Sequence, residues 1–177
     1  MNWVFTLLLS LTCAVSISSS SQEKTFTIDA LKYHEDTTKK LSFEDILSAT
    51  DSLLISNPNY QPSLYHSSSA YWIKLDFCIK HDEEQYLMEF YDQTIDSISL
   101  FVSKNGLEFK KYQFGSSYNF DDKPFQHKNF EVFLGGEGNY VAYARIVSRN
   151  YVDIRVAVRS INRFINYALN EYYLYGL

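Results

Sequence analysis

The chain has 177 residues, a length that suits one domain of ordinary size with short extensions. Its 16 Lys and Arg against 21 Asp and Glu give a formal net charge of −5, which argues against a protein that binds a nucleic-acid backbone. Hydrophobic residues make up 46% and aromatic residues 17%, so we expect a packed domain rich in strands. Two cysteines do not make a disulfide framework, and the core itself must supply the stability.

Residues 1–21 have the pattern of a secretory signal peptide. They carry no charged side chain, and an apolar run from Trp3 to Val15 is followed by small residues up to Ser21. We therefore expect an exported protein that is cleaved after Ser16 or at a later site up to Ser21. The alternative is a buried strand or helix at the N-terminus.

The segment after the leader predicts one strand, one short helix and one loop. Residues 25–33 alternate between apolar and polar side chains, as an opening strand does. Ser42 is a candidate N-cap with Asp45 three positions later, which predicts a helix over 42–49. Residues 56–69 contain two prolines and many polar side chains, which predicts a loop.

From residue 70 onward the sequence predicts short strands with few helices between them. In the first, over 71–79, alternate residues form an apolar face: Tyr71, Ile73, Leu75, Phe77 and Ile79. Further strands are expected over 85–91, 98–103, 107–114, 128–134, 140–147 and 154–158. The Asn105-Gly106 pair and the glycines at 135–138 each predict a hairpin turn. This spacing predicts an all-β antiparallel sandwich.

The last segment changes to a helical period. The apolar residues recur at helical spacing: Ile161, Phe164, Ile165, Ala168, Leu169 and Tyr172. Tyr172, Tyr173 and Tyr175 then form an aromatic cluster of the kind found at membrane interfaces, with packing against the sandwich as the alternative. We therefore expect a domain over 22–160 and a juxtamembrane amphipathic helix over 161–177. This helix leads toward a membrane region that the sequence does not contain.

No local motif of an enzyme or a metal site is present in the sequence. The four histidines lack zinc-ligand spacing, and there is no nucleophile elbow or phosphate-binding loop. Asp121 and Asp122 lie in a loop, where a structural calcium site and paired catalytic carboxylates are minor alternatives to a solvated pair. We expect no catalytic residues, no metal and no cofactor.

Two groups of residues are candidates for binding a small ligand. Trp72, Lys74 and Asp76 share the second face of the strand over 71–79, where an indole ring flanked by polar groups could hold a sugar; the alternatives are a core tryptophan and a surface ion pair. Tyr118, Lys123 and His127 lie in a long loop, and long loops on rigid sandwiches often bind ligands; the alternative is a solvated loop. We interpret Cys78 as a small apolar residue under the sheet.

Six segments, taken in order, resemble a known family. They are SFEDIL (42–47), YWIKLDF (71–77), YLMEFYDQTIDSISLFV (86–102), FGSSYNFDDKPFQHKNFEVFL (114–134), YVAYARIVS (140–148) and FINYALNEYYLYGL (164–177). The chain is similar to the extracellular type 2 domain of bacterial seven-transmembrane receptors with diverse intracellular signalling modules. The resemblance implies a jelly-roll-like β-sandwich similar to carbohydrate-binding modules, at the periplasmic or extracellular face of a bacterial membrane. It also implies that the domain senses a small ligand such as a carbohydrate.

The first hypothesis is therefore a non-catalytic extracytoplasmic sensor domain of a membrane signalling receptor. The alternative is a stand-alone secreted carbohydrate-binding or adhesion module, because the seven membrane helices and the output module are absent from the sequence. A homodimer formed through the receptor is an additional hypothesis. Where the family often has arginine, this chain has Lys74 and Lys123, which weakens bidentate recognition of carboxylates or phosphates.

Overall fold

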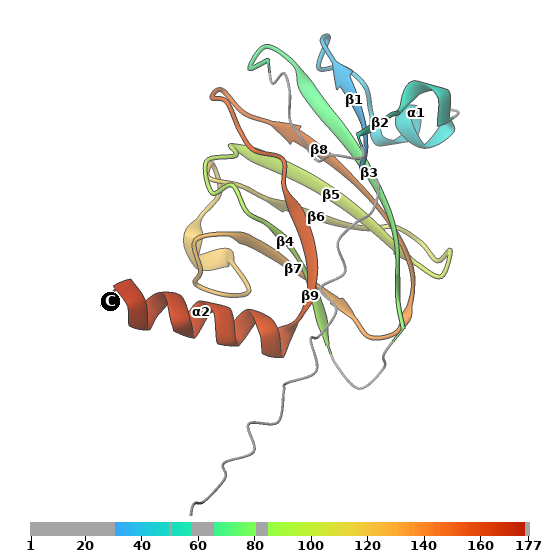
Figure 1. The fold of residues 1–177 in the computed structure, drawn as a ribbon. Helices are drawn as coiled ribbons and strands as arrows, with labels where there is room; N and C mark the ends of the chain where they lie inside the picture. The colour runs from blue at the N-terminus through green and yellow to red at the C-terminus, as the bar shows by residue number, and fades with distance from the viewer. Residues whose placement is uncertain (1–30, 50, 58–65, 81–84, 176–177) are drawn as a thin grey trace, which may run out of the picture.

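The computed structural model describes residues 31–49, 51–57, 66–80 and 85–175. Within these residues the chain forms a large and a small antiparallel sheet that pack face to face, with a helix beside the small sheet (Figure 1). The prediction of an all-β sandwich with a short N-terminal helix and a C-terminal helix is confirmed. None of the helices in the described part of the chain is long and apolar enough to cross a membrane.

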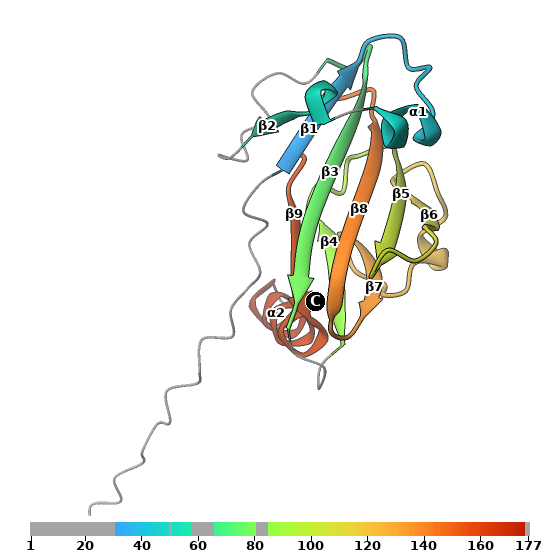
Figure 2. The same cartoon turned by 90° about the vertical axis from the view of Figure 1, so that its right-hand side faces the viewer.

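The large sheet has six strands in the order β2-β1-β3-β8-β5-β6 (Figure 2). Their bounds are β1 Leu31–Asp36, β2 Ile55–Asn57, β3 Ala70–Ile79, β5 Ser97–Lys104, β6 Lys110–Phe114 and β8 Gly138–Val147. The small sheet has the order β7-β4-β9, with bounds β4 Tyr86–Phe90, β7 Phe130–Gly135 and β9 Val156–Ser160. The helices are α1 Phe43–Ser48 and α2 Ile161–Tyr175, with short 3₁₀ turns at Asp51–Leu53 and Phe120–Asp122.

The main core lies between the two sheets and follows from alternation along the strands. Tyr71, Ile73 and Leu75 of β3 point into it, as the sequence predicts, together with Met88 and Phe90 of β4. A second, smaller cluster lies on the opposite face of the large sheet. There Ile46 of α1 packs on the side chains of Trp72 and Tyr143, with Phe43 of α1 and Phe101 of β5 packed against them.

Short sequence motifs predicted α1 and one hairpin correctly. Ser42 caps α1 and forms a capping box with Asp45: the Ser42 hydroxyl accepts a bond from the Asp45 backbone N–H, and the Asp45 carboxylate accepts one from the Ser42 backbone N–H. Asn105 and Gly106 have positive φ angles of 54° and 73°, and they turn β5 into β6. The expected loop over 56–69 is wrong at Ser56 and Asn57, which belong to β2. Residues 58–65 of that loop and residues 25–30 of the opening strand lie outside the described residues.

The turn at residues 135–138 is not a hairpin. It joins β7 to β8, but β7 pairs with β4 in the small sheet and β8 pairs with β3 and β5 in the large sheet. The prediction of a hairpin is therefore wrong, because glycines specify a reversal of the chain and say nothing about which strands pair afterwards.

Cys78 is exposed, so its interpretation as a residue under the sheet is also wrong. It lies on the outer face of β3, the face that begins with the buried Trp72 beneath α1. Exposure rises along that face, from 16% for the Lys74 side chain to 56% for that of Asp76. Cys78 therefore lies beyond the part of this face that is covered.

Candidate ligand pocket and its buried ion network

A pocket of about 560 Å³ lies between residues 115–128, which we call the pocket loop, and the C-terminal half of α2. Its lining residues include four aromatic rings, namely Tyr118, Phe120, Phe130 and Tyr172. The polar and charged lining residues are Gln93, Ser116, Lys123, Gln126, His127, Lys128 and Glu171, and Gly115 completes the wall. This volume falls within the roughly 300–1,000 Å³ of typical small-molecule sites.

The pocket loop begins at Gly115, where the backbone approaches another segment closely. Gly115 has φ +141°, and a Cβ atom built there would lie 2.3 Å from the backbone oxygen of Asp96. The approach is held because the backbone N–H of Ser116 donates to the Ile95 carbonyl at 2.8 Å and that of Ser117 donates to the Asp96 carbonyl at 3.1 Å. Only glycine fits this corner, and the corner places one wall of the pocket.

We expect Gly115→Ala to lower the free energy of unfolding by about 2 kcal/mol or more, because the new methyl group meets rigid backbone as well as an unfavourable φ angle. Gly106→Ala is the matched control: Gly106 also has a positive φ, but a Cβ there meets none of the described residues within 4 Å. Urea denaturation of both variants checks this. An equal loss in the two would contradict the role of the close approach.

Lys123 closes the pocket loop on itself. Its Nζ donates to the carbonyls of His127, Asn129 and Lys128 at 2.8, 3.0 and 3.3 Å. The ammonium also lies 4.5 Å from the ring centroid of Phe130. Burial lowers the pKa of Lys123, and the charge of Glu131 partly opposes this. The ammonium of Lys123 is therefore engaged by two carbonyls of the pocket loop and by the carbonyl of Asn129, the residue that follows it.

The outer face of the small sheet carries buried charges. Glu89 of β4 lies directly opposite Glu131 of β7, and both are almost fully buried. Like charges opposite one another repel, so this pairing needs compensation. Arg159 of β9 supplies it, with its Nε 3.0 Å from Glu89 Oε2, while Asn129 Nδ2 donates to Glu89 Oε1 at 2.7 Å.

His127 links this sheet face to α2. Its Nδ1 lies 2.9 Å from Glu131 Oε1, and its Nε2 lies 3.5 Å from Glu171 Oε2 on α2. The other oxygen of Glu171 accepts bonds from Lys128 Nζ at 2.7 Å and from the Tyr167 hydroxyl at 2.5 Å. The imidazole thus lies between two carboxylates that belong to different elements: it is hydrogen-bonded to Glu131, while Nε2 approaches Glu171 without a hydrogen-bond partner among the described residues.

The pKa values in this network follow from burial and charge. Burial lowers the pKa of His127, but the hydrogen bond and charge of Glu131, with Glu171 and Glu89, outweigh it, so the pKa is raised. Burial raises the pKa of Glu131 against the opposing effect of His127. Burial and Glu171 raise the pKa of Tyr167 to about 12. For Glu171 burial is outweighed by bonds from Lys128 and Tyr167, and its pKa is lowered.

Glu89, His127 and Glu131 bring possible metal-ligand atoms within 4.8 Å of one another in the described part of the chain. The arrangement does not suit a cation, however. Both oxygens of Glu89 already face donors, Asn129 and the guanidinium of Arg159, and a metal ion would have to displace or repel that positive charge. We therefore interpret these groups as an ion network and assign no metal to them.

The two groups of candidate binding residues lie in different parts of the fold. Tyr118, Lys123 and His127 all line the pocket. Lys74 and Asp76 lie on β3, in the other sheet, where Lys74 Nζ is 3.8 Å from Asp76 Oδ2. The nearby Trp72 is 1% exposed, so its ring has no face open to a ligand. Trp72, Lys74 and Asp76 are therefore not part of the candidate site.

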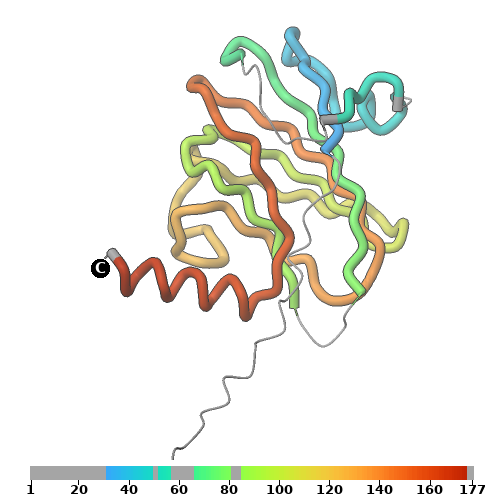
Figure 3. The backbone as a smooth tube through the Cα atoms, viewed as in Figure 1, coloured from blue at the N-terminus to red at the C-terminus, as the bar shows by residue number. Residues whose placement is uncertain are grey.

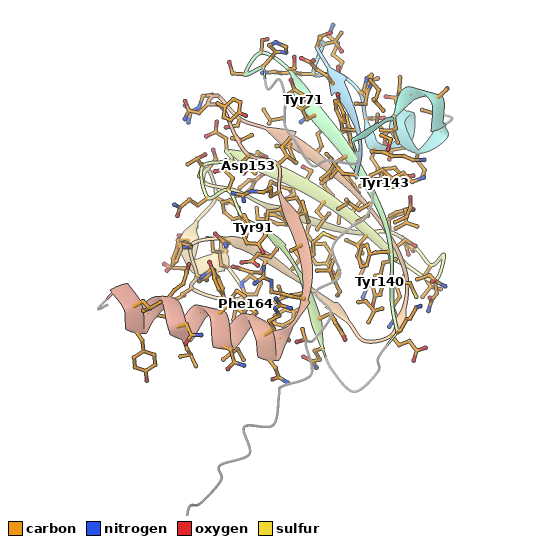
Figure 4. All side chains as sticks on the ribbon, viewed as in Figure 1. Tyr71, Tyr91, Tyr140, Tyr143, Asp153 and Phe164 are labelled. Atoms are coloured by element: carbon orange, nitrogen blue, oxygen red, sulfur yellow. The ribbon has the colours of Figure 1, made fainter. Side chains whose placement is uncertain are left out.

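The face of α2 that meets the sheet differs from the predicted apolar stripe. Phe164 and Ala168 are buried, and Phe164 points toward the sandwich (Figure 4), but Ile165 and Leu169 are 42% and 48% exposed. Tyr167 and Glu171 lie on the inner side instead, because they meet the buried charges of the small sheet. The strand β9 runs directly into this helix (Figure 3).

Sequence reasoning missed Glu89, Arg159 and Glu171 as members of the site. Glu89 and Arg159 each stand within a short strand of otherwise mostly apolar residues. A charged residue inside such a strand is a usable signal of a buried ion pair. Tyr172, proposed as a membrane anchor, lines the pocket, and its hydroxyl donates to the Gln126 carbonyl at 3.2 Å.

The described residues form a two-sheet sandwich with a ligand-sized pocket at its edge, and comparison with known families identifies the kind of domain. The family described as 7TMR-DISM extracellular 2 matches residues 29–160, most of the chain, and the chain belongs to this family. The family comprises extracellular sensor domains of membrane receptors, so the expected resemblance and location outside the cytoplasm are supported. No curated protein matches the chain significantly.

Proposed function

We propose that this domain senses a small, uncharged ligand, such as a carbohydrate, in the pocket between the pocket loop and α2, without catalysing a reaction. The observation that carries the proposal is that α2 supplies part of the pocket wall through Glu171 and Tyr172. A ligand held there touches both the sandwich and the helix that follows it.

The chemistry of the lining supports an uncharged ligand. Aromatic rings such as Tyr118 and Phe120 can pack on the apolar faces of a sugar, and amides such as those of Gln93 and Gln126 can bind its hydroxyl groups. The cations are already engaged, because Lys123 binds three carbonyls and Lys128 pairs with Glu171. An anion would find no free cation there among these residues.

The position of α2 suggests how binding becomes a signal. We propose that residues 1–21 are a signal peptide, that 22–160 form the sensor and that 161–177 lead toward a membrane, with Tyr172, Tyr173 and Tyr175 near its surface. Exposed Leu174 and Tyr173 supply apolar area at that end of α2. A ligand that binds better when α2 is docked shifts the helix toward the docked position. A homodimer of receptors is one arrangement that would respond to such a shift of α2.

A thermal-shift screen of the full chain tests the proposal. We expect a neutral oligosaccharide to raise Tm, whereas amino acids, nucleotides and divalent cations do not; binding at 100 times Kd corresponds to about 2.7 kcal/mol. Tyr118→Ala should abolish the shift, and Tyr173→Ala, on an 84% exposed ring outside the pocket, should leave it intact. A shift that survives Tyr118→Ala would place the ligand elsewhere, and no shift with any compound would contradict small-ligand sensing.

A further inference from the structure

We propose that His127 is a proton-controlled latch between the sandwich and α2, so that protonation of one buried imidazole regulates the pocket. This inference rests on the proposed function for its biological meaning, but the latch itself is a property of the ligand-free domain. It goes beyond ligand sensing, because the proton is a second input to the same helix.

The latch follows from the two nitrogen atoms of the ring. Nδ1 faces Glu131 on β7 at 2.9 Å, and Nε2 faces Glu171 on α2 at 3.5 Å. A neutral imidazole has one N–H and can donate to only one of these carboxylates, whereas an imidazolium donates to both. The link from sheet to helix through this ring is therefore complete only in the charged form.

The surroundings of His127 need that charge. Charged and titratable groups from every packed element face this region: Glu131 on β7, Glu89 on β4, Arg159 on β9, Glu171 and Tyr167 on α2, and Lys123 and Lys128 in the pocket loop. Arg159 pairs with Glu89 and Lys128 pairs with Glu171. His127 is the close ionic partner of Glu131. Among the described residues, Glu131 Oε2 and His127 Nε2 are both buried without a hydrogen-bond partner, and the carboxylate that Nε2 faces is that of Glu171.

The raised pKa of His127 sets the direction of the switch. A raised pKa means that the folded state holds the proton more tightly than an unfolded chain, in which the value is about 6.5. The stabilisation is therefore complete below about pH 6.5 and is lost as pH rises through the folded-state pKa. Above that pH, Nδ1–H and Glu131 can stay paired while Nε2 carries no proton and is no longer attracted to Glu171, 3.5 Å away, so the C-terminal half of α2 loses one tie to the sandwich.

Hydrogen exchange of the full chain without ligand tests the latch. Between pH 6 and pH 9, after correction for intrinsic rates, we expect protection of a peptide from the C-terminal half of α2 to fall about tenfold, the size of one charge-assisted hydrogen bond. A peptide from β5 should not change. His127→Gln and Glu171→Gln should each give the low protection at both pH values; Glu171→Gln changes a residue nearer the surface, in case the first variant does not fold.

His66 provides a matched control, because its Nδ1 also lies 2.9 Å from a carboxylate, that of Glu35, but its side chain is 54% exposed. Glu35 belongs to β1, which lies at the end of the sandwich away from α2 (Figure 1). His66→Gln should keep the pH step. A step that persists in His127→Gln or is absent from the native chain would overturn the latch. Protection of α2 by zinc chloride at pH 9, reversed by a chelator, would also overturn the latch, because a cation would then lie between His127 and the carboxylates. Loss of the latch with an intact saccharide response would leave the proposed function standing.

Discussion

Replacing Arg159 with methionine is expected to lower the free energy of unfolding by about 3–5 kcal/mol, the usual loss when one partner of a buried ion pair is removed. Glu89 is fully buried opposite Glu131, and without the guanidinium 3.0 Å away the two carboxylates face each other with less compensation. Urea denaturation at pH 7 measures the loss.

Two comparisons separate this effect from ordinary loss of a side chain. Glu89→Leu combined with Arg159→Met should recover much of the stability, because the pair is then removed as a unit. Arg149→Met should change the unfolding free energy very little, since Arg149 pairs with Asp96 while its side chain is 86% exposed. A loss with Arg159→Met no larger than with Arg149→Met would show that the buried network does not need the charge.

Trp72→Ala is expected to lower the free energy of unfolding by about 3–5 kcal/mol, as truncation of a large buried aromatic residue does. The ring is 1% exposed and packs with Tyr143 beneath Ile46 of α1, so its removal leaves a cavity that short α1 has little means to fill. Under conditions in which the variant is still folded, affinity for a pocket ligand should stay unchanged.

Leu107→Ala is the control for Trp72→Ala, because Leu107 is 68% exposed and its truncation should change stability by no more than about 0.5 kcal/mol. If Trp72→Ala were as stable as this control and weakened saccharide binding, the outer face of β3 would be the binding surface after all.

The sequence predicted those parts of the fold that depend on neighbouring residues. Alternation gave the inward face of β3, the Ser42–Asp45 box gave the start of α1, and Asn105-Gly106 gave the β5–β6 turn. Pairing between distant strands has no such local signature. The glycines at 135–138 therefore predicted a reversal correctly and the partner strands wrongly.

The candidate site was predictable only in its loop. A long loop before a strand is a good place to look for binding residues, and Tyr118, Lys123 and His127 do line one pocket. Alternation also put Trp72 on the outer face of β3, but nothing local to β3 says that α1 covers it. For α2, the spacing of apolar residues predicted that Ile165 and Leu169 face the sandwich, but both are exposed. The side of α2 that faces the sandwich carries Glu171, because His127 in the pocket loop faces its carboxylate.

The most direct test of the central claim is a chemical-shift map of the isotopically labelled full chain, titrated with a mixture of neutral mono- and disaccharides. The claim that the ligand lies between the pocket loop and α2 predicts shifts at Tyr118, Lys128 and Tyr172 that continue along α2, with β3 unchanged. Shifts confined to the outer face of β3 around Lys74 and Asp76, or shifts in the loop that never reach α2, would contradict it.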